Sequence, residues 1–226
     1  MPAIVDEFRA DAVLPRHRHR HGYASVILAG RFTEASFCGV AQAEAGDVLL
    51  HGRFDCHADY GDGGTNAIQI LRLPWGDDEV EGHFRVSDPD ALVLIAERDP
   101  QAASEALARE IRPVSVIHPH WADILAMELR REDASSLHDW AAGAGVRPEA
   151  LSRGFGRYFG VSPKRYRLEA RSRRGWQKVM RSTQTLTAIA HECGFADLAH
   201  LSRSVRALTG APPSAWRATV KSGRGD

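Results

Sequence analysis

Apolar residues in the first third of the chain gather in short runs, which glycine, aspartate and proline residues separate. Short runs that are rich in β-branched residues and bounded by turn formers are typical of β-strands. We expect strands over residues 23–28, 32–40, 48–50 and 68–71, with a turn at Gly46-Asp47. Several short strands in succession predict a β-sandwich or barrel.

The pattern becomes helical after residue 86. In Asp88-Pro89 and Asp99-Pro100, a capping carboxylate precedes a proline at the first helical position. We therefore expect helices over residues 89–97 and 100–111, then a connector over 113–119. Apolar residues recur at helical spacing over residues 121–131 and from Leu137 onward, up to a tail over 222–226 that we expect to be disordered.

Two segments of the helical part each predict a helix-turn-helix unit. The first begins with a short helix over residues 137–142. Gly145 follows and permits a turn with positive φ. A second helix then starts at Pro148 and directs Leu151 and Phe155 inward.

The second unit repeats this arrangement. The inner face of its short helix is formed by Leu186, Ile189 and Ala190. Gly194 makes the turn, and Asp197 is a good N-cap for the next helix. The candidate inward positions of that helix are Leu198, Leu201 and Val205.

Pro163–Arg181, between the two units, is expected to form one long helix that is dense in arginine. At ~1.5 Å per residue it is ~28 Å long. Successive major-groove faces of B-DNA are ~34 Å apart. One chain can therefore place the second helix of each unit in adjacent turns of one groove face.

The formal net charge of zero hides a strong asymmetry. Residues 1–136 hold 13 basic and 23 acidic side chains, a net charge of −10, whereas residues 137–226 hold 16 basic and 6 acidic side chains, a net charge of +10. This division predicts an acidic module joined to one that binds a polyanion.

At 226 residues the chain is long enough for two small domains. No apolar run approaches the roughly 20 residues that span a bilayer. Cys38, Cys56 and Cys193 form no disulfide framework. These observations favour a cytoplasmic protein without a membrane partner.

The C-terminal part resembles the AraC family of transcription regulators over about residues 121–217. The similarity is strongest in Ile189-Ala190-x-x-Cys193-Gly194-Phe195-x-Asp197-x-x-His200-Leu201-Ser202-Arg203, continuing through Gly210, Pro213, Trp216 and Arg217. The first unit matches in Ala142-x-x-Gly145-Val146, Leu151-Ser152-Arg153-x-Phe155 and Gly160-Val161-Ser162-Pro163. It departs at Arg147, where a serine cap is usual, and at Gly154, which costs its helix about 1 kcal/mol.

The resemblance implies which residues face DNA. The base-facing positions of the family correspond to Glu149, Ser152 and Arg153 in the first unit, and to Leu198, Ala199, His200, Ser202 and Arg203 in the second. The expected phosphate contacts are Arg157, Arg206 and Arg217. For any one arginine the alternative is a salt bridge on the helix surface.

The N-terminal part resembles the cupin-like sensor domain that often precedes AraC-type DNA-binding domains. The similarity lies in His17-Arg18-His19-Arg20-His21, just before a predicted strand, and in His51 and His57 beyond the turn. It implies that His17 and His19, or His19 and His21, converge with His57 on a transition-metal ion. The glutamate of cupin enzymes is absent after the pair, and Cys56 is a candidate substitute. A histidine-lined pocket without metal, or solvated histidines, is the alternative.

Together these features predict an α+β chain. Residues 1–86 are expected to form a cupin-like β-barrel, or double-stranded β-helix, that acts as a sensor. Residues 87–116 are expected to form a helical linker, which contacts a second copy of the chain in a homodimer or packs on its own barrel. Residues 117–220 are expected to form an all-α AraC-type domain.

The predicted function is a non-enzymatic, sequence-specific transcription regulator. It would bind double-stranded DNA and respond to a small-molecule or metal effector. The alternative is a cupin-type metalloenzyme with an appended DNA-binding domain.

Overall fold

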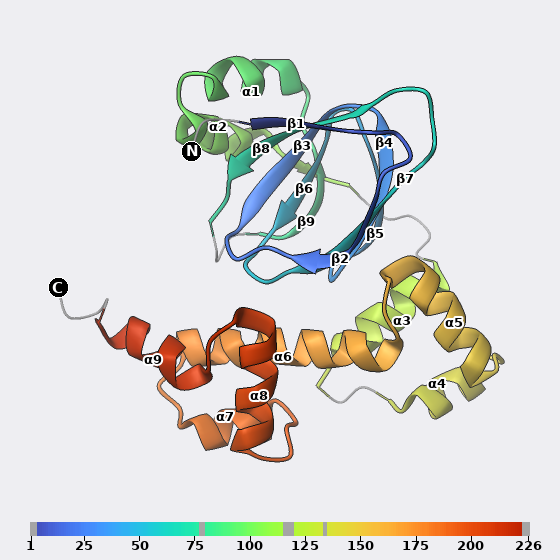
Figure 1. Ribbon diagram of the computed structural model, residues 1–226, viewed down its shortest axis with the longest axis vertical. Helices are drawn as coiled ribbons and strands as arrows, with labels where there is room; N and C mark the ends of the chain where they lie inside the picture. Colours follow the sequence, from blue (N-terminus) through green and yellow to red (C-terminus); the bar gives the residue numbers. More distant parts are fainter. Residues whose placement is uncertain (1–3, 77–79, 115–119, 133–134, 223–226) are drawn as a thin grey trace. The chain divides into compact units, whose positions relative to one another are not determined.

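The computed structural model describes residues 4–76, 80–114, 120–132 and 135–222. The chain divides into two compact units, Met1–Asp123 with Tyr158–Gly160 and Ile124–Arg157 with Val161–Asp226. Sheets dominate the first unit, and the second is all-α (Figure 1). Most of the predicted connector, the boundary at residues 116–117 and the predicted tail beyond residue 222 lie outside the described residues.

The N-terminal unit contains two antiparallel sheets. The larger sheet has the order β1-β8-β3-β6-β9-β10, formed by Ile4–Phe8 (β1), Ile68–Pro74 (β8), Tyr23–Ala29 (β3), Asp47–His51 (β6), Gly82–Arg85 (β9) and Arg112–Pro113 (β10). The smaller sheet has the order β2-β7-β4-β5, formed by Val13–Arg18 (β2), Cys56–Gly61 (β7), Arg31–Ser36 (β4) and Gly39–Glu44 (β5). The β-sheet character of this part is confirmed, whereas its cupin type stays a prediction.

Apolar side chains of both sheets fill the space between them. Ile27, Leu49 and Ile70 come from the larger sheet, and Phe32 and Ala43 come from the smaller one. Each of these five residues is at most 7% exposed. Successive side chains of a strand point to opposite faces of a sheet. The neighbours of these residues along each strand of the larger sheet therefore point to its other face.

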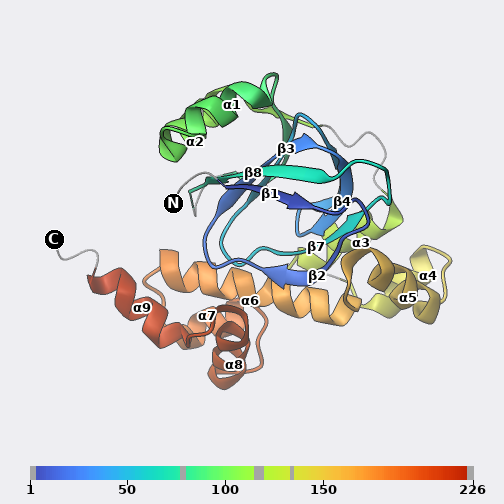
Figure 2. The same cartoon turned by 45° about the horizontal axis from the view of Figure 1, so that its top comes forward.

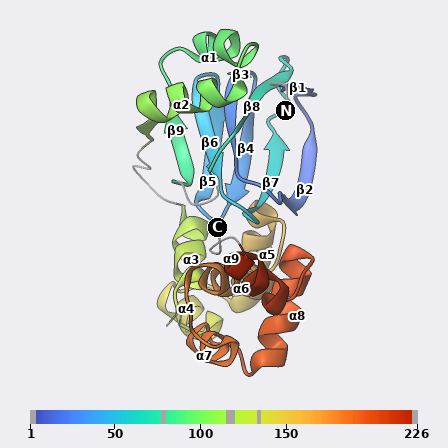
Figure 3. The same ribbon diagram turned by 90° about the vertical axis from the view of Figure 1, so that its left-hand side faces the viewer.

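Two helices cover that other face, α1 (Pro89–Ala96) and α2 (Pro100–Glu110). They lie next to each other beyond the strands β3 and β8 (Figures 2 and 3). Leu92 of α1 and Leu107 of α2 share one buried cluster with Leu50 and Leu73 of the sheet. Both helices were predicted, and they pack on their own sheet. Contact with a second copy stays a prediction.

One predicted strand is wrong. Residues 32–40 do not form a single strand, because a turn at Phe37 and Cys38 separates β4 from β5. Ser36 pairs with Gly39 across this turn, and Gly39 has a φ of +118°. The apolar character of Phe37, which is 3% exposed, hid the turn from the pattern.

The C-terminal unit is built from helices. They are α3 (Trp121–Arg130), α4 (Leu137–Gly143), α5 (Pro148–Phe159), α6 (Pro163–Arg181), α7 (Leu186–Glu192), α8 (Leu198–Thr209) and α9 (Pro213–Ser222). The helices α4 and α5 lie near one end of α6, and α7 and α8 lie near its other end (Figure 1). The two predicted units and the long helix between them are therefore present.

Local sequence signals explain where these helices begin. The side chains of Ser136, Ser162, Thr185 and Asp197 each accept a hydrogen bond from a backbone N–H in the first turn of α4, α6, α7 and α8. The helix α5 follows Arg147, which stands at the usual serine position and whose side chain has no acceptor atom for such a hydrogen bond. None of the described helices is long and apolar enough to cross a membrane.

Candidate DNA-reading faces and a histidine cluster

The helix α5 buries one face and exposes the residues that were assigned to DNA. Leu151 and Phe155 are at most 1% exposed. Glu149 and Arg153 are exposed, and Ser152 is half-buried beside them. The structure therefore divides α5 into a buried face and an exposed face, as predicted.

The helix α8 is divided in the same way. Leu201 and Val205 are fully buried. Ala199 and Arg203 are exposed, while His200 and Ser202 are half-buried. The prediction that Leu198 points inward is wrong, because this side chain is 36% exposed at the start of the helix. Its exposure is consistent with its other assignment, among the base-facing residues.

Four exposed arginine side chains on these two helices have no ion pair and no hydrogen bond within the part of the chain that the structure describes. They are Arg153, Arg157, Arg203 and Arg206. The alternative of salt bridges on the helix surface therefore finds no support for this group. An unpaired guanidinium can bind a phosphate, or the O6 and N7 atoms of a guanine.

Arg217 differs from these four. Its Nε donates to the carbonyl of Val179 and one of its terminal nitrogens donates to the carbonyl of Gln184, both at 2.9 Å. These contacts tie α9 to the end of α6 and to the loop before α7. Its predicted phosphate contact is untested, but its side chain already has a structural role.

Two arginines of α6 also donate to backbone carbonyls, which the sequence did not reveal. Arg171 donates to the carbonyl of Gly194, in the turn before α8, at 2.9 Å. Arg174 donates to the carbonyl of Arg130, the last residue of α3, at 2.7 Å. Cations at the ends of helices satisfy free carbonyl groups and oppose the helix dipole.

In the N-terminal unit, three histidines converge. His17 on β2 pairs in register with His57 on β7, and their ring centroids are 4.2 Å apart. His19 follows two residues after His17, and its ring centroid lies 5.4 Å from that of His57. One nitrogen from each ring lies within 4.8 Å of the others. The pair that meets His57 is therefore His17 and His19.

Two other candidate ligands do not join this group. His21 lies further along the loop and is exposed. Cys56 precedes His57 in β7 and so points to the opposite face of the sheet. Its thiol lies 3.7 Å from the Phe54 carbonyl, and it is absent from the donor groups that the described residues form.

The three histidines are held in the neutral form that binds metals. Burial lowers the pKa of His17 and His57, and it lowers the pKa of His19 to about 4 with help from the charges of His17 and Arg72. The Nδ1 atom of His57 and the Nε2 atom of His19 are buried and have no hydrogen-bond partner among the described residues. Unpartnered lone pairs fit a bound cation.

A second group of titratable residues adjoins the first, with the ring centroid of His51 4.6 Å from that of His57. His51 is 2% exposed and lies 3.3 Å from Glu34 and 3.1 Å from Asp55. Although burial opposes a charged ring, these two carboxylates raise the pKa of His51 to about 10. Burial and the charge of Glu34 raise the pKa of Asp59 to about 8. The sequence pattern placed His51 near His57 but did not link it to Glu34, Asp55 or Asp59.

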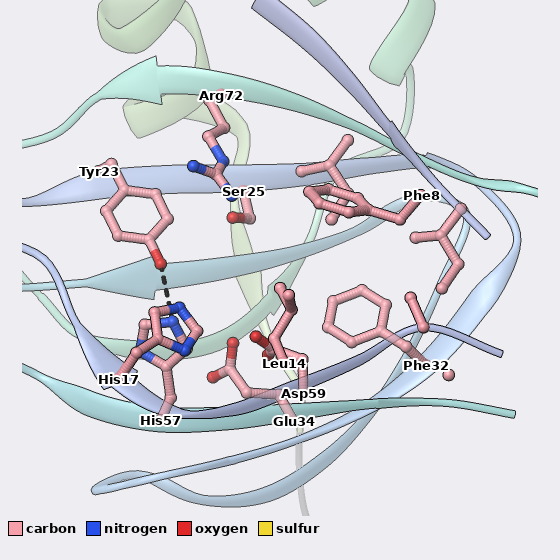
Figure 4. Close-up of a pocket in the computed structure, with 14 residues that line it drawn as sticks. Phe8, Leu14, His17, Tyr23, Ser25, Phe32, Glu34, His57, Asp59 and Arg72 are labelled. Atoms are coloured by element: carbon pink, nitrogen blue, oxygen red, sulfur yellow. Dashed lines mark hydrogen bonds between the residues drawn. The ribbon is translucent and has the colours of Figure 1, made fainter. Parts of the chain in front are cut away.

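A small cavity between the sheets, with a volume of about 40 Å³, is lined by His17 and His57 of the first group and by Glu34 and Asp59 of the second. Its polar end holds His17, His57 and Tyr23, whose hydroxyl lies 3.1 Å from Nε2 of His57 (Figure 4). Phe8 and Phe32 lie at the other, apolar end (Figure 4). The cavity therefore joins an apolar space to a set of nitrogen and oxygen donors.

Comparison with known proteins concerns the helical unit. Residues 140–219 match the helix-turn-helix domain family. The HTH-type transcriptional regulator GbdR of Pseudomonas aeruginosa, in strains UCBPP-PA14 and PAO1, is 32% identical over 96 residues. These residues cover 42% of this chain and 26% of GbdR, so the chain spans about a quarter of the length of the curated relatives it matches.

Solved structures give matches of similar extent. A transcriptional regulator with an AraC-type DNA-binding domain, from Chromobacterium violaceum, is 31% identical and has a TM-score of 0.39; the match covers 43% of this chain and 87% of that chain. The DNA-binding domain of AdpA, in complex with a target DNA, is 23% identical and has a TM-score of 0.41, with coverages of 46% and 94%. The family match over residues 140–219 spans α5 to α8.

Proposed function

We propose that this chain is a DNA-binding transcription regulator of the AraC type, whose N-terminal unit senses an effector. The observation that carries the proposal is the set of four unpaired, exposed arginines on the two helices, α5 and α8, of a matched helix-turn-helix domain. The net charge of +10 over residues 137–226 favours the same partner, a polyanion.

The two kinds of exposed residue have different roles in this proposal. Bases are read by Glu149, Ser152 and Arg153 on α5, and by Leu198, Ala199, His200, Ser202 and Arg203 on α8. Arg153 and Arg203 suit guanine, and the exposed Leu198 suits the methyl group of thymine. Arg157 and Arg206 contact phosphates and fix the position of the helices.

A salt titration tests the proposal with the full chain and a duplex selected from the upstream regions of its own genome. If about 6–10 phosphates are contacted, the affinity falls by roughly three to five orders of magnitude between about 50 and 200 mM salt. An unrelated duplex of equal length is the control, and it binds more weakly. A flat salt response, or equal binding of both duplexes, contradicts the proposal.

For the N-terminal unit we propose a cupin-like sensor that holds a transition-metal ion on His17, His19 and His57. Three neutral imidazoles suit Zn, Fe, Ni or Cu. Their donor atoms lie within 4.8 Å of one another, a spacing from which the three rings can converge on one ion at about 2.1 Å. His17 Nδ1 lies 3.0 Å from the Pro15 carbonyl, to which it can donate, and this hydrogen bond would leave Nε2 for the metal.

An effector can change DNA binding only if it binds one conformational state of the protein more tightly than another. We propose that α1 and α2 form the contact with a second copy of the chain. Leu94 on the outer side of α1 is 65% exposed and supports this assignment. In the same proposal, the sensor domain ends at residue 86, the helical linker at residue 116 and the DNA-binding domain at residue 220. The protein is located in the cytoplasm.

The alternative, a cupin-type metalloenzyme with a DNA-binding domain, draws on one observation. Glu34, His51 and His57 form a second donor group. Glu34, on β4, therefore offers a carboxylate beside His57, although the glutamate that follows the histidine pair in cupin enzymes is absent from the sequence. Oxygen consumption by protein loaded with Fe(II), in the presence of candidate substrates, tests this function. Turnover that His57→Ala abolishes would support the enzyme, and its absence favours the sensor.

A further inference from the structure

A groove on the outside of the N-terminal unit is large enough for a small organic molecule. Its volume is about 440 Å³, within the range of about 300–1,000 Å³ that is usual for ligand pockets. The loop after β2 forms one wall with His19, Arg20 and His21, and the end of β8 forms another. Pro100, the first residue of α2, closes one end.

The cavity between the sheets does not offer this space. Its 40 Å³ is enough for about three water molecules, at about 10–15 Å³ each. Tyr23 and Arg72 line both the cavity and the groove, so these two side chains separate them. An organic effector of the proposed sensor therefore fits in the groove, without repacking of the interior.

The charge of the groove is opposite to that of its surroundings. Residues 1–136 carry a net charge of −10, yet two arginines and one aspartate line the groove. Arg72 pairs with that aspartate, Asp6, at 2.9 Å. Arg20 is exposed, and its guanidinium has no ion pair or hydrogen bond with any described residue. One unpaired cation remains, which favours an anionic ligand.

The rest of the groove is apolar and held in place. Leu73, Pro74 and Pro100 offer hydrocarbon surface. The hydroxyl of Ser104 lies 2.6 Å from the carbonyl of Pro74 and 3.0 Å from that of Pro100, and it ties the start of α2 to the end of β8. The apolar wall is therefore fixed before any ligand arrives, which lowers the entropic cost of binding.

We propose that this groove binds an organic carboxylate, with its apolar body against Leu73, Pro74 and Pro100 and its carboxylate at Arg20 and Arg72. An arginine can hold a carboxylate by two parallel hydrogen bonds. As an effector site, the groove rests on the proposed regulator function. Its occupant touches both the sheet and α2, one of the two helices assigned to contact with a second copy.

Calorimetric titration of the full chain with sodium benzoate, octanoate and 2-naphthoate tests the proposal. EDTA is present, so that metal binding does not contribute. At least one carboxylate is expected to bind saturably, and 2-naphthalenemethanol, the neutral analogue of 2-naphthoate, is expected to bind more weakly. Arg20→Gln is expected to lower the affinity about tenfold or more, because a hydrogen bond to a charged group is lost.

Arg18→Gln is the matched control. It removes the same charge two residues away, from an exposed arginine that does not line the groove, and is expected to leave the affinity unchanged. Absence of saturable binding by all three carboxylates overturns the proposal. So does an equal affinity for the alcohol, or an equal loss in both variants.

DNA binding of Arg20→Gln without carboxylate separates this site from the regulator function. It is expected to equal that of the wild type, because Arg20 lies outside the helix-turn-helix domain. If the wild type itself fails to bind DNA, the regulator function is contradicted, while the carboxylate result stands on its own.

Discussion

A Cβ atom placed on Gly175 would lie 2.9 Å from Cδ1 of Leu201. Gly175 is in the middle of α6, and Leu201 is a fully buried residue of α8. The ring of Phe195, in the turn before α8, lies only 3.3 Å from the same position. The absence of a side chain at Gly175 therefore lets α8 approach α6 closely.

Gly175→Ala is expected to destabilise the C-terminal unit. Crowding in a packed core costs about 1–3 kcal/mol, against a gain of about 1 kcal/mol for alanine in a helix. Thermal unfolding followed by circular dichroism measures the net effect. Gly156→Ala on α5 is the control, since the nearest neighbour of its Cβ lies at 3.8 Å, and it is expected to stabilise by about 1 kcal/mol. An equal effect of both variants contradicts the close approach.

Arg217→Ala is expected to lower the stability of the helical unit by about 1–3 kcal/mol, because the carbonyls of Val179 and Gln184 lose their donor. Arg206→Ala removes an unpaired, exposed arginine, and it is expected to weaken binding to all DNA sequences without a change in stability. Urea unfolding of both variants, beside DNA binding, separates the two roles. A stable Arg217→Ala protein with weak DNA binding would favour a phosphate contact instead.

The charged state of His51 makes the stability of the metal-free N-terminal unit fall at alkaline pH. Since Glu34 and Asp55 raise its pKa from 6.5 to about 10, this contribution is fully present below pH 6.5 and is lost as the pH rises to about 10. The pKa of Asp59 is raised to about 8, so its protonated carboxyl also favours the folded state below that pH. The free energy of unfolding therefore falls further as the pH rises to about 8. Each pH unit removes up to about 1.4 kcal/mol per group.

Glu34→Gln tests this explanation, because it removes one partner of His51 and the charge that raises the pKa of Asp59. Urea unfolding in EDTA, at several pH values between 6.5 and 10, is expected to show a flatter dependence than in the wild type. An unchanged slope in the variant would mean that these groups do not set the pH dependence.

A metal held by His17, His19 and His57 is expected in near-stoichiometric amount in the purified protein, and His57→Ala is expected to lose it. Elemental analysis measures both. His21→Ala is the control, because His21 lies outside the converging group, and it is expected to keep the metal. The metal site is contradicted if the purified wild-type protein contains no metal and no transition metal shifts its melting temperature. The three histidines would then line a pocket without metal.

Local signals made the helical unit predictable. The caps at Ser162 and Asp197 and the turns at Gly145 and Gly194, with φ of 65° and 72°, act over a few residues. The predicted range of the long helix, Pro163–Arg181, is the observed one. The roles of Gly175 and Arg171 could not be predicted, because both depend on contacts with residues more than 20 positions away along the chain.

The N-terminal unit was less predictable, because its strands carry polar residues that depend on long-range pairing. The strands β1, β2, β7, β9 and β10 were missed, and the sequence DVLLH of β6 was recognised only in part. The convergence of His17 with His57 follows from the pairing of β2 with β7, 40 residues apart. The resemblance suggested this convergence and included His51, whereas no motif linked His51 to the buried Glu34 and Asp55.

Selection of bound sequences from randomised duplex DNA tests the central claim, that α5 and α8 read bases, most directly. The wild type is compared with Arg153→Ala, Arg203→Ala and the phosphate control Arg206→Ala. We expect each of the first two variants to lose preference at one position of the site, at a cost of about 1–3 kcal/mol, and the control to keep every preference. Unchanged preferences in both Arg153→Ala and Arg203→Ala would contradict the assignment of these helices to base recognition.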